Sequence, residues 1–306
     1  MGLRIRTNVA SLVAQRRLGV STESLAESSA KLSSGSRINK AADDAAGLAI
    51  SENLRSGIRS LNMAKRNAND GISIVQTAEG GLTEQSNMLI RLKELAVQSA
   101  SDTIGNTERG FLDKEYTALK DEIDRIAAIT EFNGTRLLVG DTEMPTDMGP
   151  KSSFPLEIQV GQSYYETTDA LDQRNPVNII RMDFSNLNSF TTGENSLNIG
   201  RADEGTRVVT KDDAHKSIGI LDTAITRVNE YRAYLGAVQN RLTSTVQNLG
   251  SQVESMNTAQ SRIRDTDFAE ETAKMTQASI LQQAGAAVLT QANQQPRVAL
   301  SLLQNL

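Results

Sequence analysis

Hydrophobic residues recur at seven-residue intervals in two long stretches of the chain. The first column runs from Leu54 to Ala96 and the second from Leu221 to Ile263. The first stays in phase across Gly71, so we expect the helix to continue there, at a cost of about 1 kcal/mol relative to alanine. The columns predict two long helices that pack on each other within one chain; their large members are Leu54, Leu61, Val75, Leu82, Leu89, Leu221, Val228, Leu235, Leu242 and Leu249.

The region between the two columns has a different pattern. Apolar residues recur every three or four positions over residues 111–129, which predicts a third amphipathic helix. Asn133-Gly134 predicts a turn. Pro, Gly, Thr and Asn then become common, and short alternating runs at 156–160 and 180–184 predict strands. We therefore expect a small β-containing insert over residues 141–205.

The two outermost segments, residues 1–42 and 268–306, carry apolar stripes that no further layer of sequence covers. Such helices are marginal in water when alone, and terminal segments fray unless another element holds them. We therefore expect neighbouring chains to cover them. The candidate polymerisation residues of these two arms are Leu18, Leu25, Leu32, Ile280, Leu281, Val288, Leu289, Leu300 and Leu303.

Together these patterns predict a mainly α fold. The N- and C-terminal segments form a long antiparallel helical bundle or coiled coil, and the small β-containing insert lies between them in sequence. The expected divisions are an N-terminal arm (1–42), an N-terminal helical part (43–140), the insert (141–205), a C-terminal helical part (206–267) and a C-terminal arm (268–306).

Composition narrows the possible functions. The net charge is −5 and both signs are interspersed, so no broad basic face is expected and nucleic acid is not an expected partner. The chain has no cysteine, which excludes disulfides, thiol nucleophiles and Cys-ligated zinc. No apolar run approaches the roughly 18 residues that span a bilayer, and the start lacks the pattern of a secretory signal. We expect no membrane anchor, and export would need another route.

The sequence contains no pattern that requires catalysis. Asp43-Asp44 precede a helical stretch, as does an acidic cluster around Asp267, and capping of helix starts is favoured over acid–base work. The single histidine, His215, has no partner at a diagnostic spacing and is expected at the surface. Phosphate-loop, dinucleotide and nucleophile-elbow motifs are absent from the sequence. We expect neither an enzyme nor a cofactor or metal.

Several ordered blocks at both ends resemble bacterial flagellin. The N-terminal signature of the family is similar to Lys31 through Ile50, which includes Ala41-Ala42-Asp43-Asp44-Ala45-Ala46-Gly47. Further similar blocks are residues 66–73, 76–80, 131–134, 261–271, 280–285 and 291–296. The resemblance covers about residues 1–140 and 205–306.

This resemblance implies a structural subunit that polymerises into the helical flagellar filament used for swimming. It implies arms that line the filament core, a surrounding shell of seam helices and an outward-facing insert. It also implies secretion to the flagellum through the type III export apparatus without a cleavable signal. The implied partners are other copies of the chain, an export chaperone, the filament cap and hook–filament junction proteins.

Three alternatives stay open at this point. A hook–filament junction protein resembles flagellin at its ends. A soluble coiled-coil adaptor would form a discrete oligomer instead of an open filament. An enzyme would need a pocket with convergent polar groups.

The resemblance also implies recognition by a Toll-like innate receptor. Residues 90–99 resemble the receptor epitope of the family, and Arg91, Leu95 and Glu115 occupy its matching positions. Arg91 and Leu95 are four residues apart, so we expect both on one exposed helix face. The same residues could instead pack against the next subunit.

Overall fold

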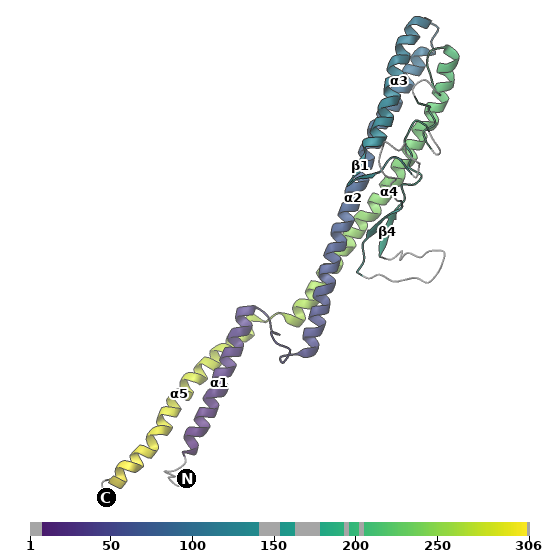
Figure 1. Cartoon of the computed structure of the whole chain (residues 1–306). Helices are drawn as coiled ribbons and strands as arrows, with labels where there is room; N and C mark the ends of the chain where they lie inside the picture. Colours follow the sequence, from purple (N-terminus) through teal and green to yellow (C-terminus); the bar gives the residue numbers. More distant parts are fainter. Residues whose placement is uncertain (1–7, 141–153, 163–177, 193–195, 202–204, 305–306) are drawn as a thin grey trace, which may run out of the picture. The chain divides into compact units, whose positions relative to one another are not determined.

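The computed structural model describes residues 8–140, 154–162, 178–192, 196–201 and 205–304, with only the backbone described for 295–304. Five helices dominate the described residues: α1 (Val9–Ser34), α2 (Ala45–Ser99), α3 (Asn106–Ile129), α4 (Lys211–Arg264) and α5 (Phe268–Gln304). The predicted mainly α fold with a small β-containing insert is confirmed (Figure 1).

The chain divides into two compact units. Unit 1 comprises residues 1–58 and 254–306, and unit 2 comprises residues 59–253. The first turns of α2 and the last turns of α4 therefore belong with the arms. The boundaries expected from the sequence follow the breaks between helices instead, and they stay predictions.

Unit 2 is built on the two apolar columns. Val75, Leu82 and Leu89 of α2 are fully buried, as are Leu221, Val228, Leu235 and Leu242 of α4, and they belong to one continuous core. Leu61 and Leu249 are nearly as buried, whereas Leu54 lies in unit 1 and is half-buried. Within unit 2 the large members of both columns are therefore buried in one core.

The two helices of this seam run antiparallel. The ion pair between Lys93 and Asp222 and the one between Glu79 and Arg232 fix opposite chain directions. Gly71 lies within α2, as predicted, and a Cβ at this position would lie 3.3 Å from Cδ1 of Leu242 and 3.4 Å from Cγ1 of Ile158. The glycine that local rules assign to a turn therefore lets α4 and a strand approach the helix closely.

Two short antiparallel hairpins accompany the helices. β1 (Glu131–Phe132) pairs with β2 (Thr135–Arg136) across a two-residue turn. Asn133 and Gly134 both have positive φ there, 50° and 77°, which is the geometry that Asn-Gly hairpin turns prefer. β3 (Leu156–Gln159) pairs with β4 (Ile179–Met182), with Ile158 opposite Ile180. The predicted turn and both predicted strand regions are thus present.

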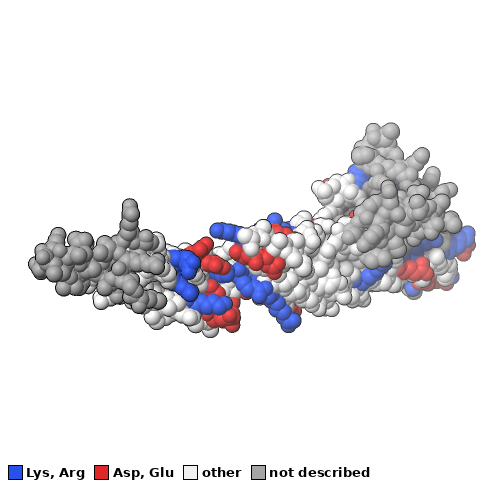
Figure 2. Space-filling model, turned by 90° about the horizontal axis from the view of Figure 1, so that it is seen from below, with Lys and Arg blue, Asp and Glu red and all other residues white. Residues whose placement is uncertain are grey.

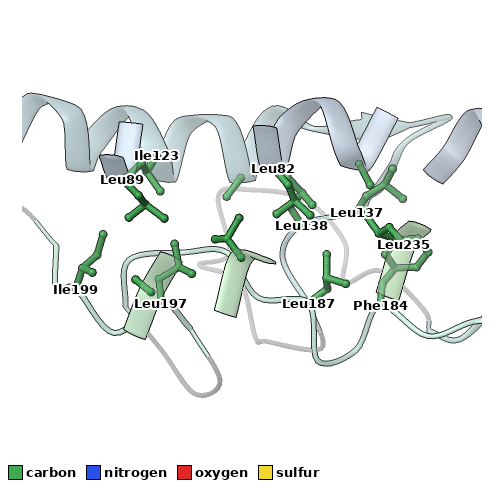
Figure 3. Packing of buried hydrophobic residues seen from close by; sticks show 14 of the residues in the cluster. Leu82, Leu89, Ile123, Leu137, Leu138, Phe184, Leu187, Leu197, Ile199 and Leu235 are labelled. Carbon is green, nitrogen blue, oxygen red and sulfur yellow. The ribbon is translucent and has the colours of Figure 1, made fainter. Parts of the chain in front are cut away.

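The described part of the insert packs on helices by side chains and not through a larger sheet. Figure 3 shows Leu82, Leu89 and Ile123 pointing toward Leu187, Leu197 and Ile199. All six are at most 3% exposed. Irregular backbone in such a place must still satisfy its polar groups.

A polar stripe on α3 supplies hydrogen-bond partners for this irregular backbone. It consists of Arg109, Asp113, Lys120 and Asp124, spaced by four, seven and four residues, which places them on one side of the helix. Within the hydrophobic surroundings, burial lowers the pKa of Lys120 and raises the pKa of Asp124. These charges are tolerated because each bonds to another segment of the chain.

The stripe bonds to the end of α2, to one segment within the insert and to the segment that follows the insert. Nε of Arg109 donates to the carbonyl of Ser99 (2.8 Å) near the end of α2. The two aspartates accept backbone N–H groups, Asp113 from Val208 (3.1 Å) and Asp124 from Thr191 (2.7 Å). Nζ of Lys120 donates to the carbonyl of Thr206 (3.1 Å). One helix therefore fixes the end of α2 and two separate loop segments.

The close approach at Gly71 can be tested by Gly71→Val. Added methyl groups meet Leu242 and Ile158, and we expect unit 2 to lose about 1–3 kcal/mol of unfolding free energy. The control is Gly80→Val in the same helix, where no atom lies within 4 Å of an added Cβ. Its effect should be within about 0.5 kcal/mol of neutral. All five tyrosines lie in residues 59–253 and the chain has no tryptophan, so tyrosine fluorescence in urea reports unit 2.

The polar stripe makes a second prediction. The carboxylate of Asp113 accepts the buried N–H of Val208 and lies 3.1 Å from the guanidinium of Arg207. Asp113→Ala removes this acceptor from both groups. We expect a loss of about 2–3 kcal/mol. Asp121→Ala removes the same charge from an exposed position of α3 and should change stability by less than about 0.5 kcal/mol. Equal losses in the two variants would show that the stripe contributes nothing specific.

Candidate assembly surface

The arm helices α1 and α5 lie side by side and antiparallel in unit 1 (Figure 1). Near one end, Nδ2 of Asn8 donates to the carbonyl of Ala292 (2.8 Å) and Oγ of Ser11 donates to Oδ1 of Asn293 (2.8 Å). Farther along, Nε2 of Gln282 donates to Oγ1 of Thr22 (3.3 Å). Polar side chains therefore set the register of the pair.

The contact face between the two helices is made mostly of small residues. The buried side chains are Ser11, Ala14, Ser28, Glu271, Ala278 and Ala292. A Cβ at Gly285 would lie 3.4 Å from Leu18, so the helices approach closely at this glycine. Small residues permit this approach, but each buries little apolar area.

Part of the predicted polymerisation set lies on this internal face. Leu18, Leu25 and Leu32 follow the buried Ser11 at seven-residue intervals and are half-buried, as is Leu289. Their side chains are used at least in part within the chain. Leu300 and Leu303 lie outside the residues whose side chains the structure describes.

The large apolar side chains of the arms point elsewhere. Ile280, Leu281 and Val288 of α5 are 60%, 51% and 58% exposed, and Phe268 is 71% exposed. In unit 2, by contrast, the column residues of the same types are almost fully buried. The arms therefore present unburied hydrophobic surface; its members are Val9, Leu12, Val13, Val20, Phe268, Ile280, Leu281 and Val288.

Some of these side chains line a groove between α1 and α5 with a volume of about 1050 Å³. Val9, Val13 and Val20 line it from α1, and Leu281 and Val288 from α5. A second concavity of about 660 Å³ lies on α5 itself, lined by residues that include Phe268 and Ile280. The two concavities adjoin, since Gln277 and Leu281 line both. We call them, together with Leu12, the assembly surface.

Charged residues follow the apolar part of the groove. Glu27, Lys31, Glu271 and Lys274 line it, and Lys31 forms an ion pair with Glu27 at 2.6 Å. A hydrogen bond to Glu270 is the main cause of a raised pKa at Lys274. On the face of the molecule shown in Figure 2, acidic and basic side chains are intermingled. Exposed pairs of this kind contribute little stability, about 0–1 kcal/mol each.

The acidic residues singled out from the sequence act as caps. Asp43 accepts the N–H groups of Asn39 and Lys40 (both 2.9 Å), and Asp44 accepts that of Gly47 (2.8 Å). Asp267 accepts the N–H of Ala269 (2.9 Å) at the start of α5. The capping prediction is confirmed, since each carboxylate bonds free N–H groups at a helix start or in the turn before it.

The described residues offer little support for a catalytic, metal-binding or membrane-spanning role. His215 is exposed, as predicted. Over residues 8–140, 154–162, 178–192, 196–201 and 205–304, no group of three or more His, Asp or Glu residues has the arrangement of a metal site. No described helix combines the length and the apolar composition that crossing a membrane requires.

The three residues of the resembling receptor epitope do not share one exposed face. Arg91 is exposed, and its guanidinium bonds to Glu115 of α3 at 2.9 Å and 3.0 Å and to Glu94 at 3.0 Å. Leu95 is fully buried in the core of unit 2. The expectation that Leu95 lies beside Arg91 at the surface is wrong, because Leu95 belongs to the core that α2 shares with α3 and α4.

The sequence pattern did not identify α1's exposed valines or Phe268 as surface residues. The heptad of Leu18, Leu25 and Leu32 drew attention to one face of α1, whereas Val9, Val13 and Val20 lie on another. A sequence signal for these residues did exist: large apolar residues occur on more than one side of the same helix. A single partner helix covers only one side, so the others must be exposed or covered by another molecule.

Comparison with known proteins identifies the family. Residues 5–143 match the model of the bacterial flagellin N-terminal helical region, and residues 218–303 match that of the C-terminal helical region. The chain is 40% identical to a flagellin of Bacillus subtilis over 99% of its length and 100% of the relative. It is also 40% identical to the flagellar filament 33 kDa core protein of Treponema phagedenis, over 98% and 99% of the two chains.

A solved structure supports the fold. The putative flagellar hook-associated protein from Vibrio parahaemolyticus matches 73% of this chain and 100% of its own with a TM-score of 0.54. At 13% sequence identity this likeness concerns the fold alone. The near full-length relatives instead decide between flagellin and the hook–filament junction alternative.

Helical ends that match both family models, full-length similarity to flagellins and exposed apolar arms all agree with a structural, non-enzymatic role outside the cell. The chain belongs to the bacterial flagellin family and is a filament subunit of the bacterial flagellum.

Proposed function

We propose that the assembly surface of α1 and α5 forms the contacts between neighbouring subunits in the filament. The supporting observation is that large apolar side chains on these two helices are about half or more exposed, although the helices already pack on each other. Full burial of one such side chain contributes about 1.5–3 kcal/mol. A neighbour that covers several of them offsets the entropy lost when free subunits become fixed.

The two adjoining concavities of the assembly surface differ in make-up, and a surface of unlike parts favours an open polymer. The groove is formed by both helices, whereas the second concavity belongs to α5. Contacts between unlike faces repeat head to tail and generate a helix when the rotation does not close. This geometry separates a filament subunit from a coiled-coil adaptor of fixed size.

The domain organisation expected from the sequence completes this proposal. Arms 1–42 and 268–306 line the filament core, segments 43–140 and 206–267 form the next shell, and the insert 141–205 faces outward. The exposure of the arm side chains supports the core assignment, because the axis of a filament is where a subunit finds the most neighbours.

The route to the filament and the further partners follow from family membership. We infer export through the flagellar type III apparatus without a cleavable signal, with an export chaperone that shields the arms before assembly. The filament cap and the hook–filament junction proteins then bind the subunit during growth. An unshielded apolar surface of this kind promotes association, which supports the need for a chaperone.

We further propose that an innate Toll-like receptor binds the surface around Arg91 and Glu115. The two side chains are about half exposed and joined across α2 and α3. A hydrogen bond to Glu115 is the main cause of a raised pKa at Arg91, and a hydrogen bond to Glu94 adds to it. The guanidinium therefore stays charged. Arginine is common among residues that dominate binding energy. Leu95 supports this surface from within the core.

Seeded filament growth tests the assembly surface. We expect Ile280→Ser to raise the subunit concentration needed for growth at least about tenfold, because a neighbour then buries a polar side chain. The control is Ile129→Ser at the end of α3, which is 56% exposed in unit 2. Sedimentation and electron microscopy measure growth from wild-type seeds. Normal growth of Ile280→Ser would contradict the proposal.

Receptor recognition is tested by surface plasmon resonance with unpolymerised protein and a Toll-like receptor ectodomain. Arg91→Ala should weaken binding at least about tenfold. Arg125→Ala removes an exposed arginine that likewise pairs with a glutamate on its own helix, Glu122, and should leave binding unchanged. Leu95→Ala is unsuitable, since it opens a cavity in the core. Equal binding by both arginine variants would refute the assignment.

A further inference from the structure

The turn between β1 and β2 holds the one Asn-Gly pair of the chain, Asn133-Gly134. Both residues are exposed. Apart from its chain neighbours, no described atom lies within 4 Å of a Cβ added at Gly134, so other segments do not shield this backbone. The side-chain amide of Asn133 and the backbone nitrogen of Gly134 therefore lie together in a turn that water reaches.

These two groups can react with each other. The Cγ atom of an asparagine amide is an electrophile, and the backbone nitrogen of the next residue can attack it and close a succinimide ring. Glycine hinders this attack least because it has no Cβ. An exposed Asn-Gly pair is thus the sequence context in which the ring closes with the least steric hindrance.

Two other asparagines of unit 2 each lack one of these features. Asn198 is also exposed, and its φ of 59° is close to the 50° of Asn133, but the branched Ile199 follows it. Asn188 is only 1% exposed, and its Oδ1 accepts the N–H of Phe190 (3.1 Å). Asn133 combines exposure with an unhindered neighbour.

We propose that Asn133 is a site of spontaneous deamidation. The nitrogen of Gly134 forms a bond to Cγ of Asn133, and the bond from Cγ to the amide nitrogen breaks. The amide leaves as ammonia, with the proton that the nitrogen of Gly134 gives up. Water then opens the succinimide at Cγ to give aspartate, or at the backbone carbonyl to give isoaspartate, whose main chain runs through Cγ. Water is consumed and ammonia released, without any oxidant or reductant.

The hairpin controls the rate of this reaction. Ring closure needs rotation about the backbone of Asn133, and the turn holds this backbone at φ of 50°. The restraint is weak, because each strand has only two residues. Short two-stranded hairpins are marginal in water, and local opening of such a segment costs less than global unfolding. The reaction therefore proceeds from a locally opened turn.

The two products act differently on the fold. Aspartate keeps the length of the main chain, and Asp-Gly forms the same kind of hairpin turn as Asn-Gly. Isoaspartate adds a carbon atom to the main chain between the strands, which conflicts with the two-residue turn. β2 leads directly into Leu137 and Leu138, which are fully buried, and the N–H of Leu137 donates to the carbonyl of Thr130 (3.0 Å). Isoaspartate in the turn therefore loosens a segment of the core.

The loss of ammonia makes this change irreversible. Modified subunits therefore accumulate as the protein ages. The site belongs to unit 2, so the reaction is independent of how the assembly surface binds neighbouring subunits.

Peptide mapping tests the site. Trypsin releases residues 126–136, in which Asn133 is the one asparagine and no glutamine occurs. After incubation of the full-length protein at mildly alkaline pH, this peptide should gain the mass of an amide converted to a carboxyl group. It should separate into two species that coelute with synthetic peptides containing aspartate or isoaspartate.

Asn198 is the internal control in the same digest. It should react at least about tenfold more slowly than Asn133, equivalent to a barrier about 1.4 kcal/mol higher. An unchanged 126–136 peptide, or equal rates at the two asparagines, would overturn the proposal.

A synthetic peptide of residues 126–136 tests the role of the hairpin. Without a fixed turn, its asparagine should deamidate about tenfold faster than Asn133 in the protein, equivalent to an opening free energy of about 1.4 kcal/mol. Equal rates in the peptide and the protein would refute control by the turn.

Asn133→Gly is the matched variant for the effect on stability. Gly-Gly suits the same kind of turn, and the variant has no side-chain amide at this position. Aged wild-type protein should unfold at a lower urea concentration than fresh protein, in proportion to its isoaspartate content, as measured by tyrosine fluorescence. Aged Asn133→Gly should match its own fresh sample. An equal loss in both proteins would refute the link between the turn and the core.

Discussion

The antiparallel packing of the apolar columns of α2 and α4 is the interaction on which the rest of unit 2 depends. It gives α3 a surface to cover and gives the described parts of the insert a wall to pack against. Gly71 makes this packing close, because any larger side chain there would meet Leu242. Without this seam, the short hairpins and irregular segments would have too little apolar surface of their own to stay folded.

The arms show that similar spacing can give a different result. Leucines at seven-residue intervals occur in α1 as they do in the seam, but alanine, serine and glycine surround them. The pair therefore approaches closely and buries little, and the larger side chains remain outside. Marginal stability within one chain is then compatible with strong stability in an assembly, since the missing burial is supplied by other copies.

The sequence predicted those features that depend on local periodicity. The two columns, the continuation of α2 through Gly71, the Asn133-Gly134 turn and the capping carboxylates follow from neighbouring residues alone. The placement of Leu95 does not, because it depends on how α3 and α4 pack on α2. The antiparallel pairing of Ser36 with Asp265 was also beyond prediction, since no local pattern links two residues so distant in sequence.

The polar stripe of α3 has a consequence for how such a chain can change. Asp124 holds Thr191, while Lys120 and Asp113 hold Thr206 and Val208, and each bond fixes one backbone position. None of these bonds depends on the number of residues in the stretches between the fixed positions. Because the entropy of a loop grows only slowly with its length, about 0.6 kcal/mol per doubling, those stretches can lengthen or diversify at little cost. A helix with fixed attachment points thus separates the evolution of the stretches between these points from that of the bundle on which they pack.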